Sequence, residues 1–367
     1  MEALSGLGCS LTLFIDTILI EDGRMKLDLI LTFLLVAILF ASVLWKSVPK
    51  EGPFSFDKNF TGVLKGVSAI VIVFVHVPEL YHNAVQRMVM SFGFVAVTLF
   101  FMISAYGMQF SANRSPDKYL SHFWRNRLAS LLIPCLLVNL FWALFNVWSE
   151  CDFPLLKYMP GYVWVLLQYC VLFFVVMFCQ QKFKIKPSVS HVVLAVAVVA
   201  SSLYLYLSSP NASDSAQMGW CYERFGLVWG LLLFVFFAKI ADFISYRWLP
   251  KTFALGLLSL VLGVAYVMNK TVWFYGEYLL KIALGFVIVS FVLILSRKRS
   301  FGNAVVNHLG VISYEIYLSH EFMMQVISYF FPTLSSGVFL VLTMILTIVF
   351  STVVHQMSSK LVNWVRV

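Results

Sequence analysis

The sequence predicts an all-α fold, a polytopic integral membrane helix bundle of about ten core transmembrane helices with one accessory helix before them. Hydrophobic residues make up 61% and charged residues only 12% of the 367 positions, whereas a soluble domain carries about 25% charged residues. Apolar runs of about 20 residues recur along the whole chain, and each can cross a hydrocarbon core of roughly 30 Å. Helices are expected because lipid offers no partners to backbone amides and carbonyls.

Eleven such runs follow one another. The first is interpreted as an anchor or packing helix, and the other ten form the core. The predicted spans lie at residues 27–45, 63–80, 91–110, 128–148, 160–179, 188–207, 225–242, 252–268, 274–295, 305–330 and 337–356.

Only short connections separate the spans, so one membrane domain is expected to carry the function. The domain runs over residues 54–357, after an accessory helix and cytoplasmic connection at 27–53. A short cytoplasmic tail follows at 358–367. Residues 1–26 are treated as an extension whose place in the native protein stays open, because Met25 precedes a clean apolar span and is an alternative start.

Basic residues decide the predicted orientation. One set of alternating connections holds 19 of the 26 Lys and Arg residues, and the opposite connections hold 4. This asymmetry fits the positive-inside rule and predicts a cytoplasmic C-terminus. Nucleic-acid binding is excluded, because no basic stretch is interleaved with stacking aromatic residues. The basic set comprises residues 46–65, 111–127, 180–187, 239–251, 296–300 and the tail from 357.

Two ionisable residues in the first core span, Lys65 and His76, are the first candidate functional groups. Each residue turns an α-helix by 100°, so eleven residues turn it by 20° more than three full turns. Both side chains therefore lie on one helix face, about 16 Å apart along the axis. Taken singly, Lys65 is explained by snorkelling and His76 by an interfacial position beside Pro78. Their common face favours function, because ionisable residues inside a membrane usually mark a site.

Two further stretches supply polar partners. Residues 93–107 (GFVAVTLFFMISAYG) carry Ser104 and Tyr106, although small residues here also suit helix packing. Residues 119–134 place Arg125 and Arg127 at the start of a helix. Guanidinium groups and a helix N-terminus both favour phosphates, while the positive-inside bias explains the same arginines without any ligand.

The stretch ISYEIYLSHEF at 312–322 is the most specific one. Tyr314, Tyr317 and His320 are spaced three apart on one helical stripe, and two glutamates flank them. Tyrosines alone would indicate core packing or an interfacial belt. A histidine and two carboxylates within an apolar span favour a functional site.

In this order the motifs resemble those of the acyltransferase-3 family, ten-helix membrane enzymes that O-acylate bacterial glycans and related acceptors. The matching stretches run from Lys65 to His76, Gly93 to Tyr106, Arg127 to Pro134 and Ser313 to His320, and the resemblance covers roughly residues 54–357. The chain departs from the pattern at three places. Lysine replaces an arginine at Lys65, alanine follows Ser104 where glycine is usual, and Ser130 stands where the family has a second arginine.

The resemblance implies an acyl donor such as acetyl-CoA, no tightly bound cofactor and no metal. It implies an acceptor hydroxyl on a surface polysaccharide or its lipid-linked precursor, with membrane lipid as the surrounding partner. His76 would act as a general base or carry the acyl group transiently, and both roles stay open. The expected catalytic group is His76, Lys65, His320 and Tyr317, and the expected donor site is Arg125, Arg127, Ser104 and Tyr106.

A glycan or lipid-linked sugar transporter is the alternative class, since polar groups would also line a transport path. Few spans are interrupted by Gly or Pro and no inverted repeat is evident. The sequence therefore favours the enzyme.

Overall fold

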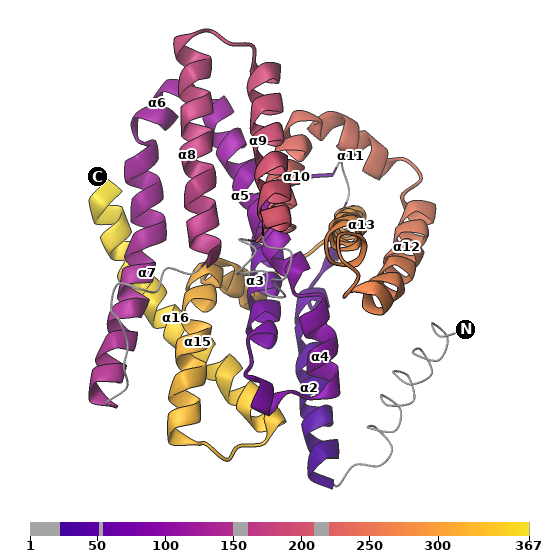
Figure 1. The fold of residues 1–367 in the computed structure, drawn as a ribbon, viewed down its shortest axis with the longest axis vertical. Helices are drawn as coiled ribbons and strands as arrows, with labels where there is room; N and C mark the ends of the chain where they lie inside the picture. The colour runs from indigo at the N-terminus through magenta and orange to yellow at the C-terminus, as the bar shows by residue number, and fades with distance from the viewer. Residues whose placement is uncertain (1–22, 51–53, 150–160, 209–219, 367) are drawn as a thin grey trace.

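The computed structural model describes residues 23–50, 54–149, 161–208 and 220–366, and there it confirms the all-α bundle (Figure 1). Most of the extension at 1–26 lies outside the described residues. The helices before residue 200 are α2 (Gly23–Leu44), α3 (Lys58–Val75), η1 (Glu79–Tyr81), α4 (Ala84–Ser91), α5 (Phe94–Arg114), α6 (Pro116–Ser121), α7 (Phe123–Trp148), α8 (Gly161–Lys182) and α9 (Pro187–Ser208). They are followed by α10 (Phe225–Val235), α11 (Phe237–Ser245), α12 (Trp248–Asn269), η2 (Tyr275–Leu280), α13 (Lys281–Leu295), α14 (Ala304–Val311), α15 (Ser313–Phe330) and α16 (Ser336–Arg366).

Among the described residues, nine helices are long and apolar enough to cross a membrane, and a tenth span arises if one bent pair counts as one. The predicted span at 225–242 is that pair, because α10 and α11 meet at an angle of 86°. The predicted span at 305–330 was wrong as a single helix, since the chain breaks at Ile312 between α14 and α15. These breaks fall at Phe236 and Ile312, neither of which is Gly or Pro, so the pattern of Gly and Pro in the sequence did not indicate them.

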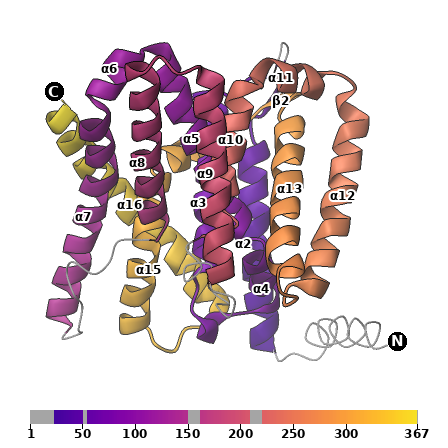
Figure 2. The same cartoon turned by 45° about the horizontal axis from the view of Figure 1, so that its top comes forward.

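The end of the bundle that carries α6, α11 and the last turn of α16 is called the C-terminal end here (Figure 2). A two-residue strand β1 (Val48–Pro49) pairs there with β2 (Arg299–Ser300) in antiparallel register. The nitrogen of Lys50 also donates to the carbonyl of Lys298 at 3.0 Å. Two connections predicted to share a side are thus in direct contact.

Helix α3, which carries Lys65, lies near the centre of the bundle in both views (Figures 1 and 2). Its first turn is capped by Asp57, whose carboxylate accepts from the Phe60 nitrogen at 2.9 Å. Such a cap satisfies one of the amides that a helix start leaves unpaired. At the other end the helix stops at Val75, and His76 occupies the C-cap position.

Glycines let the central helices cross at backbone distance. A Cβ on Gly66 would lie 2.9 Å from the Gly310 nitrogen of α14, and one on Gly310 would lie 2.3 Å from the Gly62 carbonyl oxygen. Gly226 of α10 similarly lies against the carbonyl of Thr98 in α5. Small residues at helix crossings are the usual solution in membranes, where close packing replaces the hydrophobic effect.

The accessory helix α2 is anchored by a polar contact near its beginning. Asp28 is 9% exposed and accepts from the Ser335 hydroxyl at 2.6 Å and the Gly337 nitrogen at 3.1 Å. One turn further, Thr32 accepts from the Asn83 amide at 2.8 Å. These contacts fix α2 against the start of α16 and the start of α4.

Candidate active site

The structure brings together two histidines that are 244 positions apart in the sequence. The rings of His76 and His320 lie 4.7 Å apart between centroids, at 61° to each other. The Nδ1 atoms lie 3.0 Å from the Ile72 carbonyl oxygen and 3.3 Å from the Ile316 carbonyl oxygen, respectively. A carbonyl only accepts, so Nδ1 carries the proton in both neutral rings and each Nε2 keeps its lone pair.

His320 is buried to 2% exposure, and its Nε2 makes no hydrogen bond to any residue that the structure describes. The carboxylate of Glu321 lies 4.0 Å from this nitrogen. The field of His76 also acts on Glu321. A buried polar atom without a partner is costly, so the lone pair of His320 Nε2 is a candidate acceptor for a substrate hydroxyl.

His76, His320 and Glu321 are also the side chains best placed to hold a metal ion, with donor atoms within 4.8 Å of one another. Two imidazoles and a carboxylate suit zinc. The Nε2 of His320 and the carboxylate of Glu321 are 4.0 Å apart, close to the widest separation of about 4.2 Å that two atoms on one zinc ion at about 2.1 Å can have. The absence of a metal site stays a prediction.

Tyr317 and Ser104 belong to the surroundings of the histidine pair. The Tyr317 ring lies 5.9 Å from that of His320 and 5.2 Å from that of Tyr162. The Tyr162 hydroxyl lies 3.4 Å from the Ser104 hydroxyl. Tyr162 was missed by sequence reasoning, because nothing in the apolar start of α8 distinguishes it from a core tyrosine.

Tyr106 lies elsewhere. Its ring packs edge-on against Phe56 at 4.7 Å and stands 6.1 Å from Phe110 and from Phe234. These contacts place it in an aromatic cluster on α5, α10 and the segment before α3. Its predicted place beside Ser104 in a donor site has no support in these contacts.

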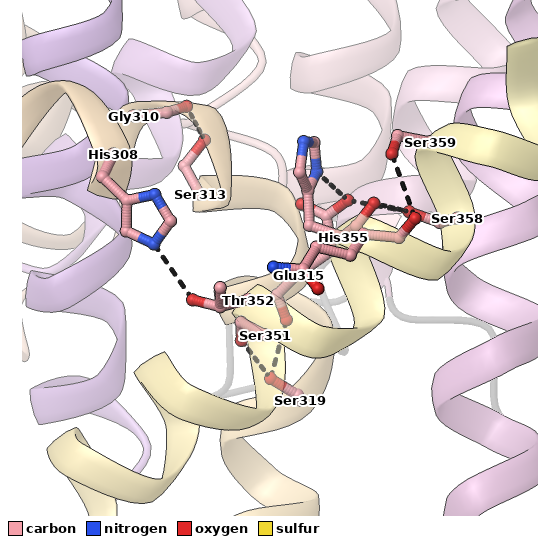
Figure 3. A network of polar contacts seen from close by, with 11 residues as sticks. His308, Gly310, Ser313, Glu315, Ser319, Ser351, Thr352, His355, Ser358 and Ser359 are labelled. Atoms are coloured by element: carbon pink, nitrogen blue, oxygen red, sulfur yellow. Dashed lines mark hydrogen bonds and ion pairs between the residues drawn. The ribbon is translucent and has the colours of Figure 1, made fainter.

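The negative charge of Glu315 attracts Lys65. Glu315 is 4% exposed, accepts from His355 Nδ1 at 2.9 Å and accepts from the Ser358 hydroxyl at 3.3 Å (Figure 3). It also lies in the first turn of α15, where the helix dipole favours a negative charge. Sequence reasoning missed His355. The one signal in the sequence is that Ser351 lies four residues before it and Ser358 three residues after it, a spacing typical of one polar helix face.

A pocket of about 270 Å³ opens at the C-terminal end of the bundle. Arg127 is half-buried there, donates to the Tyr119 hydroxyl at 3.0 Å and stands over the Phe123 ring at 5.9 Å. Burial raises the pKa of Tyr119 against the lowering effect of the Arg127 charge, so the phenol stays neutral. The pocket is lined by Tyr119, Phe123, Asn126, Arg127, Ser130 and Arg366.

The two arginines predicted to bind the donor therefore differ in their relation to the pocket. Arg127 lines the pocket, whereas Arg125 is exposed and does not. Arg366, which sequence reasoning assigned only to the tail, enters the pocket from the last turn of α16 and donates to the Asn126 carbonyl at 3.4 Å. No local sequence pattern connects residues 126 and 366.

Helix α8 links the pocket to the histidine pair. Tyr162 contacts Tyr317 beside His320, and Phe173 stacks on Phe123 of the pocket at 6.0 Å between centroids. Eleven residues separate Tyr162 from Phe173, a rise of about 16 Å. The two places thus lie at different depths of one bundle.

Comparison with known proteins adds one finding. A family model described as an acyltransferase domain, that of the acyltransferase-3 family, matches residues 58–356. Comparison with curated proteins and with solved structures gave no match. The matched residues include the histidine pair, Glu315 and Arg127, but stop before Arg366.

Proposed function

Because this chain belongs to the acyltransferase-3 family, we propose that it is an O-acyltransferase that moves an acyl group, acetyl in the first instance, from acyl-CoA to a hydroxyl. The acceptor is a surface polysaccharide or its lipid-linked precursor. The asymmetry of 19 against 4 basic residues supports the bacterial inner membrane and a cytoplasmic C-terminal end. The donor would then reach the pocket from the cytoplasm.

The orientation of the two imidazoles carries the proposal. His76 holds its proton on Nδ1 through the Ile72 carbonyl, so Nε2 is available to accept the proton of the acceptor hydroxyl. The hydroxyl oxygen then attacks the thioester carbonyl carbon, a carbon–oxygen bond forms, and the carbon–sulfur bond breaks. The imidazolium returns its proton to the leaving thiolate, which leaves the enzyme as free thiol.

The neighbours of His76 have supporting roles. Glu321, whose carboxylate lies within 4.8 Å of a ring nitrogen of His76, would stabilise the transient imidazolium. Neutral His320 would accept a hydrogen bond from the acceptor hydroxyl or from a second hydroxyl of the same sugar. Tyr317 packs on His320 and fixes its ring. Lys65, which the charge of Glu315 attracts, would act through charge balance and not by touching the reacting atoms.

The test is acyl transfer by the purified protein in detergent, with labelled acetyl-CoA and a lipid-linked oligosaccharide. His76→Ala should lower turnover by about 10²- to 10⁴-fold, the usual contribution of a general base. His308→Ala is the matched control, because this exposed histidine contacts only Thr352 among the described side chains. Full turnover in His76→Ala would remove this histidine from the mechanism.

A transporter of glycans or lipid-linked sugars is the second candidate, and one observation favours it. The 86° bend between α10 and α11 and the break at Ile312 are interruptions of the kind found in transporter helices. Family membership favours the enzyme. Movement of a fluorescent lipid-linked sugar across reconstituted vesicles in the absence of acyl donor would instead support transport.

A further inference from the structure

The pocket at the C-terminal end has the chemistry of an anion site. Its lining holds two guanidinium groups, an amide, two hydroxyl groups and no carboxylate. Guanidinium groups bind phosphate oxygens through two parallel N–H donors, and such charge-assisted bonds are about twice as strong as neutral ones. Phosphate is therefore the group that this lining fits.

Arg127 is prepared for such a ligand. A guanidinium has five N–H donors, and the hydrogen bonds described for Arg127 use one, to Tyr119. That bond and the Phe123 ring fix the direction of the side chain. The remaining donors are free to meet a ligand without further ordering of the side chain.

Arg366 approaches the same pocket from a different part of the chain. It lies in the last turn of α16, where a helix dipole favours a cation. Its bond to the Asn126 carbonyl, at 3.4 Å, is long and leaves most donors unused. Helix α16 packs along α7, which explains why a residue 239 positions after Arg127 reaches the same cavity.

The size of the pocket limits what it can hold. At about 270 Å³ it is slightly smaller than typical ligand pockets of roughly 300–1,000 Å³. It suits phosphate groups with part of a ribose, and a longer ligand must extend out of it. Helix α8 leads from Phe173 at the pocket to Tyr162 near the histidine pair, about 16 Å away along its axis.

We propose that Arg127 and Arg366 together bind the phosphate groups at the nucleotide end of the acyl donor, so that the C-terminal helix completes the donor site. The identity of the ligand as an acyl-CoA rests on the proposed function. Members of the family have a second arginine at the position of Ser130. In this chain Arg366 then supplies that second guanidinium from a distant part of the sequence. The thioester arm runs from this pocket along α8 towards His76.

The experiment measures binding separately from catalysis. Adenosine 3′,5′-bisphosphate, the nucleotide portion of coenzyme A, is titrated into the full-length protein in detergent by calorimetry. Arg127→Ala and Arg366→Ala should each weaken binding about tenfold or more, and Arg366→Lys should weaken it less because the charge stays. Lys360→Ala is the matched control, an exposed cation of α16 outside the lining, and should change affinity less than about twofold.

The outcomes separate the inference from the proposed function. Unchanged binding by Arg366→Ala, with a parent protein that binds, overturns the role of the C-terminal helix. No binding by a parent protein that transfers acetyl overturns the pocket assignment and leaves the function standing. Arginine-dependent binding by a parent that transfers nothing keeps the pocket and overturns the function. Thermal unfolding of each variant shows whether the fold is intact, and the lysine variant decides the case if Arg366→Ala unfolds.

Discussion

At the histidine pair, His320 is 2% exposed and its Nε2 meets no described hydrogen-bond partner, whereas the pocket ends in an exposed arginine. The pair is held by backbone carbonyls within its own helices. The pocket is assembled from side chains of α6, α7 and α16. The proposed base His76 is half-buried beside His320, and a fixed base next to a buried group suits proton transfer. Capture of a charged ligand from water needs accessible cations.

The difference has a kinetic meaning. Groups that meet reacting atoms change the barrier of the chemical step, and groups that hold unreactive phosphates bind ground state and transition state alike. Variants of the histidine pair should therefore lower kcat, and variants of the pocket should raise the donor KM. Each prediction below tests the histidine pair, the pocket, or the helix packing and capping that position them.

After that of His76→Ala, the largest effect is expected at His320. His320→Ala should lower kcat by about 100-fold, within the usual range for a group engaged in proton transfer, with the donor KM changed less than about twofold. Steady-state kinetics at saturating acceptor measure both constants. A raised donor KM at unchanged kcat would contradict the assignment of the histidine pair to the chemical step and would assign His320 to donor binding.

A smaller effect of the opposite kind is expected at Arg127. Arg127→Ala should raise the donor KM about tenfold and leave kcat within about threefold, because the phosphates do not react. Added salt should raise the KM of the parent protein, since the pocket is partly open and its charges are screened. If Arg125→Ala has the larger effect on KM, the lining of the pocket does not describe the donor site.

The glycine crossing that fixes α3, and with it His76, gives the third prediction. A Cβ on Gly66 meets the backbone of Gly310 at 2.9 Å, whereas one on Gly62 in the same helix meets nothing within 4 Å. Gly66→Ala should destabilise by about 1–3 kcal/mol, and Gly62→Ala should be neutral or stabilise by up to about 1 kcal/mol. Thermal unfolding in detergent compares the pair. Equal unfolding temperatures would exclude a tight crossing.

The smallest effect concerns Asp57 at the start of α3. Burial raises the pKa of Asp57, but bonds from Phe60 and Ser55 and the charge of Lys50 outweigh it and lower that pKa below 3.8. The charged cap therefore stabilises the protein above pH 3.8, and this contribution is lost as the pH falls through the lowered pKa. Asp57→Asn should cost less than about 1 kcal/mol at neutral pH, because asparagine also caps helices.

The test is the unfolding temperature of parent and Asp57→Asn from neutral pH downwards. The difference between the two proteins should shrink below pH 3.8. A difference that grows on acidification would show that the charge destabilises the helix start.

Much of the architecture could be predicted from the sequence because it depends on local properties. Hydropathy over a run of residues determines whether a helix crosses the membrane. The spacing of Lys65 and His76 predicted one helix face, but His76 lies at the C-cap position, just after the last residue of α3. The motif order was sufficient to indicate the family, which the match over residues 58–356 shows. The break at Ile312 was missed, because an apolar run does not reveal where a helix turns.

Only the tertiary structure decided which distant residues meet. His76 and His320 share a site because α3 packs on α14 through glycines at 62, 66 and 310 and also packs on α15. Sequence periodicity does not record this fit of shapes. The same holds for Tyr162 beside Tyr317 and for Arg366 beside Asn126. Periodicity predicts which face of a helix is apolar. Which helix packs on that face depends on the arrangement of the helices in space, and the sequence does not give this arrangement.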